Sequence, residues 1–186
     1  MSAPVMSGLT YDDLADLRQD DHLRRELIDG EMFVSPSPVI RHQRAVVRIA
    51  GALLAYTDEH GGLAVPAPMD VVFSPRTVVE PDVVFIGPAR VDELDNERFV
   101  DIVPDLLVEV SSPSTRRLDM IKKRGLYERE GVGEYWFVDL DADVIDVHRL
   151  GEHGAYGLPT TLDEDATLTC LAAPGFELSV LEALSR

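Results

Sequence analysis

The chain has 186 residues, one cysteine and a formal net charge of −17. This length suits one domain with a real core, and the lone Cys170 excludes an internal disulfide framework and a cysteine-based zinc site. The negative charge excludes a protein that holds DNA through its overall field, so any contact with nucleic acid must be local. No signal peptide is apparent and no apolar run reaches the ~18 residues that span a bilayer. We therefore expect a soluble, cytoplasmic protein without membrane contact.

A short helix and a hairpin are the first predicted elements. Thr10 followed by Asp13 is typical of a capping box, which predicts a helix running to about Asp21. The dipeptide Asp29-Gly30 is the turn signal of a β-hairpin, expected over residues 24–35. Glu26 lies in this hairpin, just before its turn.

Helical periodicity then predicts a long helix over residues 39–59. Its apolar face consists of Val46, Ile49, Ala50, Leu53 and Leu54. The side chain of His42 falls on the inward side, where a histidine is more often a satisfied core residue than a ligand or base. Three arginines lie together away from the apolar face: Arg41, Arg44 and Arg48.

Three short strands are expected next, over residues 63–66, 69–74 and 78–86. The last of them contains Glu80-Pro81-Asp82 before an apolar run. Asp82 therefore opens or interrupts a buried strand, and Pro81 indicates an edge or a bulge. Residues 88–103 are charged and irregular, with one helical turn.

The segment 106–111 has the apolar, β-branched content of a buried strand, yet Glu109 lies in its middle. A buried carboxylate is costly unless it is paired or hydrogen-bonded, so Glu109 requires a partner. The following helix, predicted over residues 116–130 with its cap in residues 112–115, offers one. Spacing of three and four residues puts one set of side chains on a common face, whereas Lys122 falls on another side. That set is Asp119, Met120, Lys123, Leu126 and Tyr127.

The remaining chain predicts an antiparallel strand pair over 134–140 and 143–150, then a strand at 167–171 and a closing helix at 176–184. We interpret residues 1–186 as one domain. Its core covers about residues 10–150, and residues 151–186 form a carboxy-terminal strand and helix extension.

Two carboxylates on apolar strands, Asp82 and Glu109, suit a hard divalent cation such as Mg²⁺ or Mn²⁺. With Lys123 directed at the same place, the set predicts metal-assisted hydrolysis of a phosphodiester. Each residue also has a plainer interpretation. Asp82 is equally typical of a turn, Glu109 of a structural partner for an arginine, and Lys123 of a helix-surface ion pair.

Four motifs carry a resemblance to a known family: Pro81-Asp82-Val-Val-Phe, Pro104-Asp-Leu-Leu-Val-Glu109-Val-Ser-Ser-Pro-Ser-Thr, Asp119-x-x-x-Lys123-x-x-x-Tyr127 and Gly131-Val-x-Glu134-Tyr-Trp-Phe-Val-Asp139. They resemble the Uma-type family of restriction-endonuclease-like proteins, which belongs to the PD-(D/E)XK nuclease superfamily. The resemblance extends from about Thr10 to Leu184. It implies an α/β (α+β) fold with a mixed β-sheet flanked by helices, and a Mg²⁺- or Mn²⁺-dependent endonuclease acting on DNA.

The resemblance also implies roles for individual residues. Asp82 and Glu109 would be metal ligands, with the backbone carbonyl of Val110 as a third. Ser111 stands where the superfamily's lysine is expected, so Lys123 on the next helix is the natural substitute. Three further residues complete the implied site: Glu26 in the metal shell, with His42 and Tyr127 in support.

The implied partner is DNA, held by local basic patches. One patch is Arg116, Arg117, Lys122 and Arg124, and the other is the arginine stripe Arg41, Arg44 and Arg48. Cleavage of both strands would favour a homodimer. Two other functions remain open: an interaction protein that keeps a nuclease fold without cleavage, and a hydrolase with Ser111 or Ser112 as nucleophile and His42 as base. No Gly-x-Ser-x-Gly elbow surrounds either serine.

Overall fold

The structure is a computed structural model that describes residues 6–17, 23–95, 98–112 and 116–185. Its helices are α1 (Tyr11–Leu17), α2 (Ile40–His60), α3 (Arg124–Glu130) and α4 (Val180–Leu184), with a 3-10 turn at Val91–Glu93 and a π-helical segment, η2, at Leu118–Lys123. The strands are β1 (Arg24–Ile28), β2 (Glu31–Ser35), β3 (Leu63–Pro66), β4 (Val71–Ser74), β5 (Thr77–Val79), β6 (Val83–Ile86), β7 (Leu106–Val110), β8 (Glu134–Asp139), β9 (Val144–Arg149), β10 (Thr160–Leu162), β11 (Thr167–Cys170) and β12 (Ala173–Ser179).

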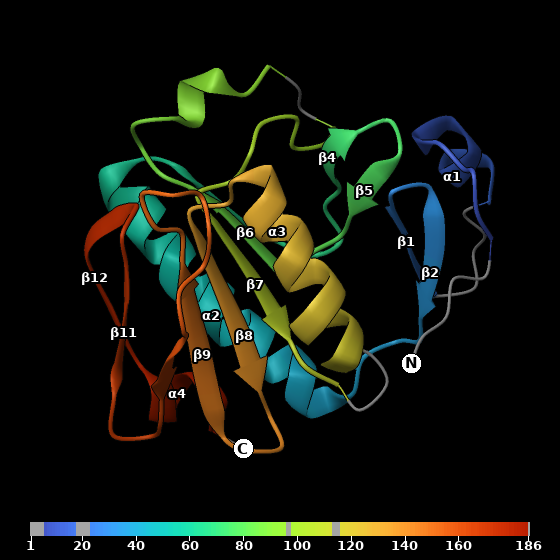
Figure 1. The fold of residues 1–186 in the computed structure, drawn as a ribbon. Helices are drawn as coiled ribbons and strands as arrows, with labels where there is room; N and C mark the ends of the chain where they lie inside the picture. The colour runs from blue at the N-terminus through green and yellow to red at the C-terminus, as the bar shows by residue number, and fades with distance from the viewer. Residues whose placement is uncertain (1–5, 18–22, 96–97, 113–115, 186) are drawn as a thin grey trace.

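A six-stranded mixed sheet in the order β10-β9-β8-β7-β6-β3 forms the centre of the fold. Its strands pair antiparallel except β7 and β8, which are parallel because the chain crosses over between them through η2 and α3. Helix α2 lies behind this sheet and α3 in front of it (Figure 1). A four-stranded antiparallel sheet, β2-β1-β5-β4, and the ribbon β11-β12 complete the molecule. The predicted α+β fold, a mixed sheet flanked by helices, is confirmed.

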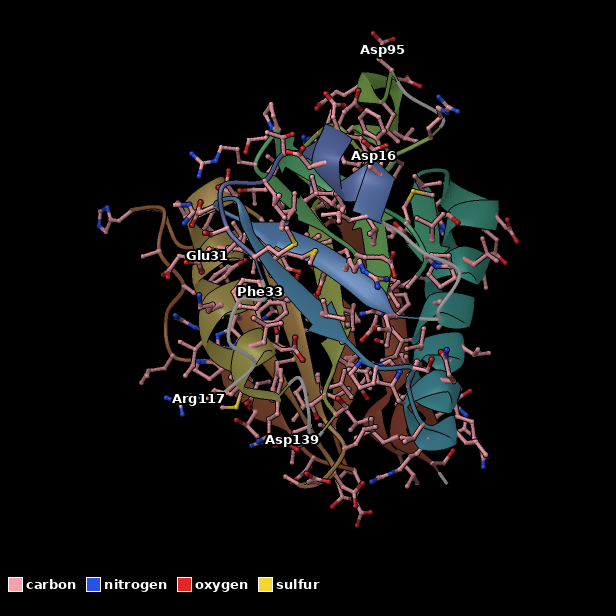
Figure 2. The ribbon with its side chains drawn as sticks, turned by 90° about the vertical axis from the view of Figure 1, so that its right-hand side faces the viewer. Asp16, Glu31, Phe33, Asp95, Arg117 and Asp139 are labelled. Atoms are coloured by element: carbon pink, nitrogen blue, oxygen red, sulfur yellow. The ribbon has the colours of Figure 1, made fainter. Side chains whose placement is uncertain are left out.

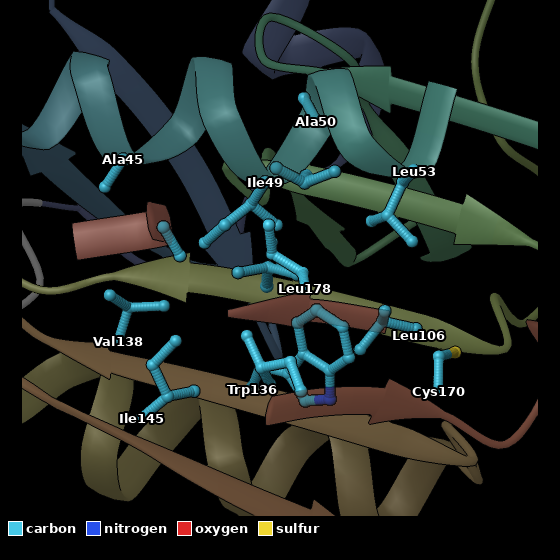
Figure 3. Packing of buried hydrophobic residues seen from close by; sticks show 14 of the residues in the cluster. Ala45, Ile49, Ala50, Leu53, Leu106, Trp136, Val138, Ile145, Cys170 and Leu178 are labelled. Carbon is cyan, nitrogen blue, oxygen red and sulfur yellow. The ribbon is translucent and has the colours of Figure 1, made fainter. Parts of the chain in front are cut away.

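Both faces of the central sheet are buried, and β7 shows how its residues divide between them. Leu106 and Val108 point toward α2, whereas Leu107 points toward α3, following the two-residue period of a strand. On the α2 side, Ile49 and its helical neighbours pack against Trp136 and Leu178 (Figure 3). Cys170 is a small buried residue of this cluster. Glu109 has the parity of Leu107, so it points toward α3 and away from water.

The amino-terminal predictions agree with the structure where it describes the chain. The backbone N–H of Thr10 donates to the Asp13 carboxylate at 2.8 Å, which is the reciprocal half of a capping box. Asp29 and Gly30 both have positive φ, 55° and 80°, as a two-residue hairpin turn between β1 and β2 requires. The predicted end of the first helix near Asp21 lies outside the described residues.

The prediction of one strand over residues 78–86 was wrong. The segment is divided between β5, in the four-stranded sheet, and β6, in the six-stranded sheet. Pro81 lies at the break, where a residue without an N–H cannot continue a ladder. Because the chain changes sheets here, Asp82 stands at the start of β6 and beside the four-stranded sheet.

Two side chains were assigned to the wrong helix face. Leu54 was predicted on the apolar face of the long helix, but it is 50% exposed, because the core contacts of α2 continue from Leu53 to Tyr56 and leave Leu54 at the side edge of the buried stripe. Met120 was predicted to share the inward face of Lys123 and is 41% exposed. The cause is the π-helical segment η2, which has a wider turn than the α-helical spacing assumes.

The carboxy-terminal predictions need two corrections. The segment 176–184 is not one helix: residues up to Ser179 belong to β12, and only Val180–Leu184 is helical. Strand β10 was not predicted, because its sequence Thr-Thr-Leu is short and lies in a turn-rich stretch. None of the helices in the described part of the chain has the length and apolar character needed to cross a bilayer.

Candidate active site

Asp82 and Glu109 come together because β6 and β7 are neighbours. Val83 lies opposite Val108, so the residues just beyond this pair, Asp82 and Glu109, are next in register and share the face turned toward α3. Asp82 is buried and accepts hydrogen bonds from Arg24 at 2.8 Å, from His42 at 3.1 Å and from the backbone N–H of Val110 at 2.7 Å. Burial alone would raise the pKa of Asp82, but these partners outweigh it and hold that pKa well below its usual range.

Glu109 is held by side chains from η2 and α3. Its Oε1 accepts from Lys123 Nζ at 2.9 Å and from the Tyr127 hydroxyl at 2.6 Å. Burial raises the pKa of Glu109 well above its usual range, and the charges of Asp119, Asp82 and Glu26 add to this rise while Lys123 opposes it. Both hydrogen bonds use Oε1, which leaves Oε2 as the oxygen available for a further cation.

Lys123 is the centre of the buried charges. Its Nζ lies 2.8 Å from Glu26, 2.9 Å from Glu109 and 3.8 Å from Asp119. Burial alone would lower the pKa of Lys123, yet the three carboxylates outweigh it and raise that pKa, so the ammonium stays charged. Lys122 instead lies at the surface, bonded to Glu31 and over the ring of Phe33. The predicted inward orientation of Lys123 and outward orientation of Lys122 are confirmed.

Glu26 reaches the site from a different sheet. It lies on β1, in the hairpin that crosses in front of the central strands between α2 and α3 (Figure 2). Its Oε1 accepts from Lys123 and also from the backbone N–H of Glu80 at 2.8 Å. Glu26 therefore lies beside Lys123 in the same cavity, and its predicted role in a metal shell stays a prediction.

Sequence reasoning missed Arg24. This residue precedes Glu26 by two positions on β1, so both side chains lie on the same face of the strand. Arg24 bonds Asp82 at 2.8 Å and Glu80 at 3.2 Å. The two-residue period beside Glu26 was the signal that could have identified it.

His42 and Val110 contact Asp82 in ways that the sequence could not specify. The Nε2 atom of His42 donates to Asp82, whereas its buried Nδ1 has no hydrogen-bond partner among the described residues. Val110 contributes its N–H to Asp82, not the carbonyl oxygen that was expected to bind metal. The inward orientation of His42 is confirmed, and a ligand role for the carbonyl of Val110 stays a prediction.

A small cavity of about 20 Å³ lies among these groups. This is enough for one water molecule or one bare ion. Its lining includes Glu26, His42, Asp82, Glu109 and Lys123. A groove of about 420 Å³ adjoins it and shares Arg24 with it, so a substrate in the groove would meet the charged groups through Arg24.

The donor set suits a hard divalent cation, because carboxylate oxygens of Asp82, Glu109 and Glu26 line one cavity. Within the described residues, however, no three His, Cys, Asp or Glu side chains form a ready coordination shell. The reason is visible in the contacts: Arg24 and His42 bond Asp82, and Lys123 bonds the other two carboxylates. Binding of a cation would require Arg24 to release Asp82; the carboxylate oxygens themselves are the ligand type that such a cation prefers.

The two predicted basic patches are largely committed to contacts within the protein. Arg41 bonds Asp143 and the carbonyl of Leu140, and Arg48 bonds the carbonyl of Ser185. The other patch behaves similarly, through the pairs Arg116 with Asp139, Lys122 with Glu31 and Arg124 with Glu128. Arg44 and Arg117 are exposed. A DNA-binding role for these patches stays a prediction.

The alternative serine nucleophile is not supported at Ser111, whereas Ser112 lines the cavity together with His42 and its role stays a prediction. Ser111 is buried and its hydroxyl oxygen accepts from the backbone N–H of Leu140 at 3.3 Å. His42, the base in that alternative, is bonded through Nε2 to Asp82.

Comparison with known proteins agrees with this architecture. The chain resembles a crystal structure described as a "putative nuclease belonging to DUF820" from Anabaena variabilis, with a TM-score of 0.79 and 18% sequence identity over 95% of this chain and 98% of that one. At that identity the likeness shows the fold alone. No curated protein matches the chain in a sequence search. The family model of Uma2, described as "Putative restriction endonuclease", matches residues 10–181. The chain belongs to the Uma2 family.

Proposed function

We propose that this chain is a divalent-metal-dependent endonuclease that hydrolyses phosphodiester bonds in DNA. The observation that carries the proposal is the convergence of Asp82, Glu109 and Lys123, from three separate elements, around one cavity. Burying two carboxylates and a charged lysine together costs desolvation free energy and adds little to stability. Such a cluster is more readily explained by a catalytic role than by a structural one. The Uma2 description and the nuclease fold neighbour support the same reaction class.

In this proposal Asp82 and Glu109 would hold Mg²⁺ or Mn²⁺, and Glu26 and the carbonyl of Val110 would be further ligands. When bound, the metal lowers the pKa of water and polarises the phosphoryl oxygen. Lys123 orients the attacking water and stabilises the negative charge that develops on the phosphate. Tyr127, whose pKa is raised well above its usual value by burial and by Glu109, keeps its proton and fixes the Glu109 carboxylate.

His42 and Arg24 act on the other carboxylate. The hydrogen bond from His42 fixes the orientation of Asp82. Arg24 lies at the junction of cavity and groove, so after leaving Asp82 it binds a substrate phosphate. A guanidinium suits both partners because it forms planar hydrogen bonds to carboxylate and phosphate alike.

A second function is favoured by one observation, which is that both oxygens of Asp82 are already bonded by the protein. A nuclease fold that no longer binds metal would keep such internal pairs permanently. That protein would act only by binding partners. Metal affinity separates the two functions.

A cleavage assay tests the proposed reaction. The purified protein is incubated with supercoiled plasmid or single-stranded DNA, in Mg²⁺, Mn²⁺ or chelator. We expect metal-dependent cutting by the wild type, none by Glu109→Ala, and full cutting by Glu31→Ala, which removes an exposed carboxylate. Calorimetric titration with Mn²⁺ alone accompanies the assay. Absence of both cutting and Mn²⁺ binding would reject the nuclease in favour of the second function, a nuclease fold that acts only by binding partners.

Arg24→Gln should bind Mn²⁺ about 10-fold more tightly than the wild type while cutting DNA at least ~10-fold more slowly. The Mn²⁺ affinity rises because the Arg24 guanidinium no longer competes with the metal for Asp82. The cleavage rate falls because the substrate phosphate loses its hydrogen bonds to that guanidinium. Calorimetry and plasmid cleavage measure the two effects. Arg129→Gln, which changes a half-exposed arginine bonded to Asp29 outside both the cavity and the groove, is the matched control. Weaker Mn²⁺ binding in Arg24→Gln would make Arg24 a purely structural partner.

A further inference from the structure

The outer face of α2 carries an apolar stripe that the fold leaves uncovered. Ile40, Val47 and Leu54 recur every seven residues and are 81%, 68% and 50% exposed. Gly51 lies between the last two on the same side of the helix, and a Cβ added there would meet no atom within 4 Å. Figure 2 shows α2 at the edge of the molecule with its outer side chains directed to solvent. Spacing of three and four residues is the pattern of a helix that pairs with another helix.

The two halves of the stripe differ in shape. Its amino-terminal half borders a hollow of about 470 Å³ lined by residues that include Ile40, Arg44 and Val47. The carboxy-terminal half presents Leu54 as an exposed apolar side chain. Two copies of α2 that pair antiparallel with their axis near Gly51 put Val47 of each against Leu54 of the other. The missing side chain at Gly51 lets the two helices approach closely at the centre.

Charges along the stripe match the same arrangement. Arg44 is seven residues before Gly51 and Asp58 is seven residues after it, and both are exposed on this face. An antiparallel pair therefore brings each Arg44 to the Asp58 of the other copy. The opposed helix dipoles also favour this direction. Although the whole chain has a net charge of −17, this face offers both signs and so does not repel its own copy.

We propose that the outer face of α2 is the interface of a homodimer, formed by antiparallel pairing of α2 with α2 of a second copy about a two-fold axis at Gly51. An isologous contact needs one surface patch that is complementary to itself, and the hollow, Leu54 and the pair of charges provide it. The interface does not depend on the proposed nuclease activity. The hollow shares Pro38 and Gln43 with the groove beside the candidate active site, so the interface would border that groove, whereas His42 on α2 points inward, away from the interface.

Sedimentation velocity of the full chain over a range of concentrations is the test. The wild type should dimerise, and Val47→Glu should weaken the dimer at least ~30-fold because it buries a charge in the apolar centre. Leu158→Glu, at a residue that is 97% exposed elsewhere on the surface, should leave the dimer unchanged. A wild type that is monomeric throughout, or a dimer indifferent to Val47→Glu, overturns the proposal.

Charge exchange tests the antiparallel direction itself. Arg44→Asp and Asp58→Arg should each weaken the dimer, and the double variant should restore it, because the pair is re-formed with reversed signs. Gly51→Gln should weaken the dimer while raising the melting temperature of the monomer, since glutamine favours a helix more than glycine does. Failure of the double variant to recover, with both single variants folded by circular dichroism, overturns the direction and with it this interface.

Discussion

Replacing Lys123 by methionine should lower the free energy of unfolding by about 3–5 kcal/mol and abolish DNA cleavage. Methionine has a similar length but leaves Glu26 and Glu109 buried without the ammonium that lies 2.8 and 2.9 Å from them. Denaturant titration measures the stability, and plasmid cleavage measures the rate. Mn²⁺ binding by the folded fraction should persist at high pH, where Glu109 is ionised, because Asp82, Glu109 and Glu26 all remain.

Lys122→Met is the matched control, since it makes the same lysine-to-methionine substitution at the adjacent residue. Lys122 is at the surface, so the loss of stability should stay below about 1 kcal/mol, and cleavage should fall far less than in Lys123→Met. Equal effects of the two substitutions would contradict the central role of Lys123.

The pH dependence of Lys123→Met adds a second check. Without the ammonium the pKa of Glu109, already raised by burial, moves further up. A carboxyl group whose pKa is higher in the folded than in the unfolded state stabilises the fold at low pH and loses that effect as pH rises through the folded pKa. The variant should therefore regain stability relative to the wild type as the pH is lowered from neutral toward the ordinary pKa range of a glutamate. A variant that loses stability over that range would mean that the carboxylates remain charged.

Glu109→Gln should reduce Mn²⁺ affinity at least ~10-fold and cleavage at least ~10²-fold, while stability stays within about 1 kcal/mol of the wild type or rises. The amide has nearly the same shape, and it removes one negative charge from a cluster in which Glu26, Asp82 and Asp119 raise the pKa of Glu109. Lys123 keeps Glu26 as a partner. Calorimetry, cleavage and thermal unfolding give the three values.

Glu134→Gln is the control for burial. Glu134 is as buried as Glu109, but it accepts from Trp136 Nε1 and from the backbone N–H of Leu171, both at 2.9 Å, outside the candidate site. This change should cost about 1–3 kcal/mol and leave Mn²⁺ affinity unchanged. The opposite pattern, with Glu109→Gln costing stability and sparing metal binding, would make Glu109 a structural residue.

Tyr127→Phe should reduce cleavage less than Glu109→Gln, because it removes only one hydrogen bond to Glu109.

Local periodicity predicted the parts of the site that lie within one element. The apolar strand around Glu109 indicated a buried carboxylate, and helical spacing directed Lys123 inward and Lys122 outward. These inferences need only the period of a strand or helix and a count of apolar neighbours. The same reasoning failed for Met120, since the π-helical turn of η2 has no signature in the residues themselves.

Contacts between distant elements could not be predicted in this way. Arg24 carries no motif, and its ion pair with Asp82 depends on how the hairpin packs beside β6. The division of residues 78–86 between two sheets likewise follows from the path of the chain after Pro81, not from the composition of the strand. The resemblance to a nuclease family supplied the candidate residues, but the hydrogen-bond partners of Asp82 could be identified only from the three-dimensional structure.

The docking of two sheets has a consequence for the order of folding. Arg24 and Glu26 belong to the four-stranded sheet, whereas Glu109 belongs to the six-stranded one. Contacts between residues so far apart in the sequence form late in folding, because closing the long loop between them costs conformational entropy. A folding intermediate with only the central sheet would lack the complete set of carboxylates and could not bind metal tightly. A metal bound as proposed would therefore stabilise the native state relative to such an intermediate and slow its opening.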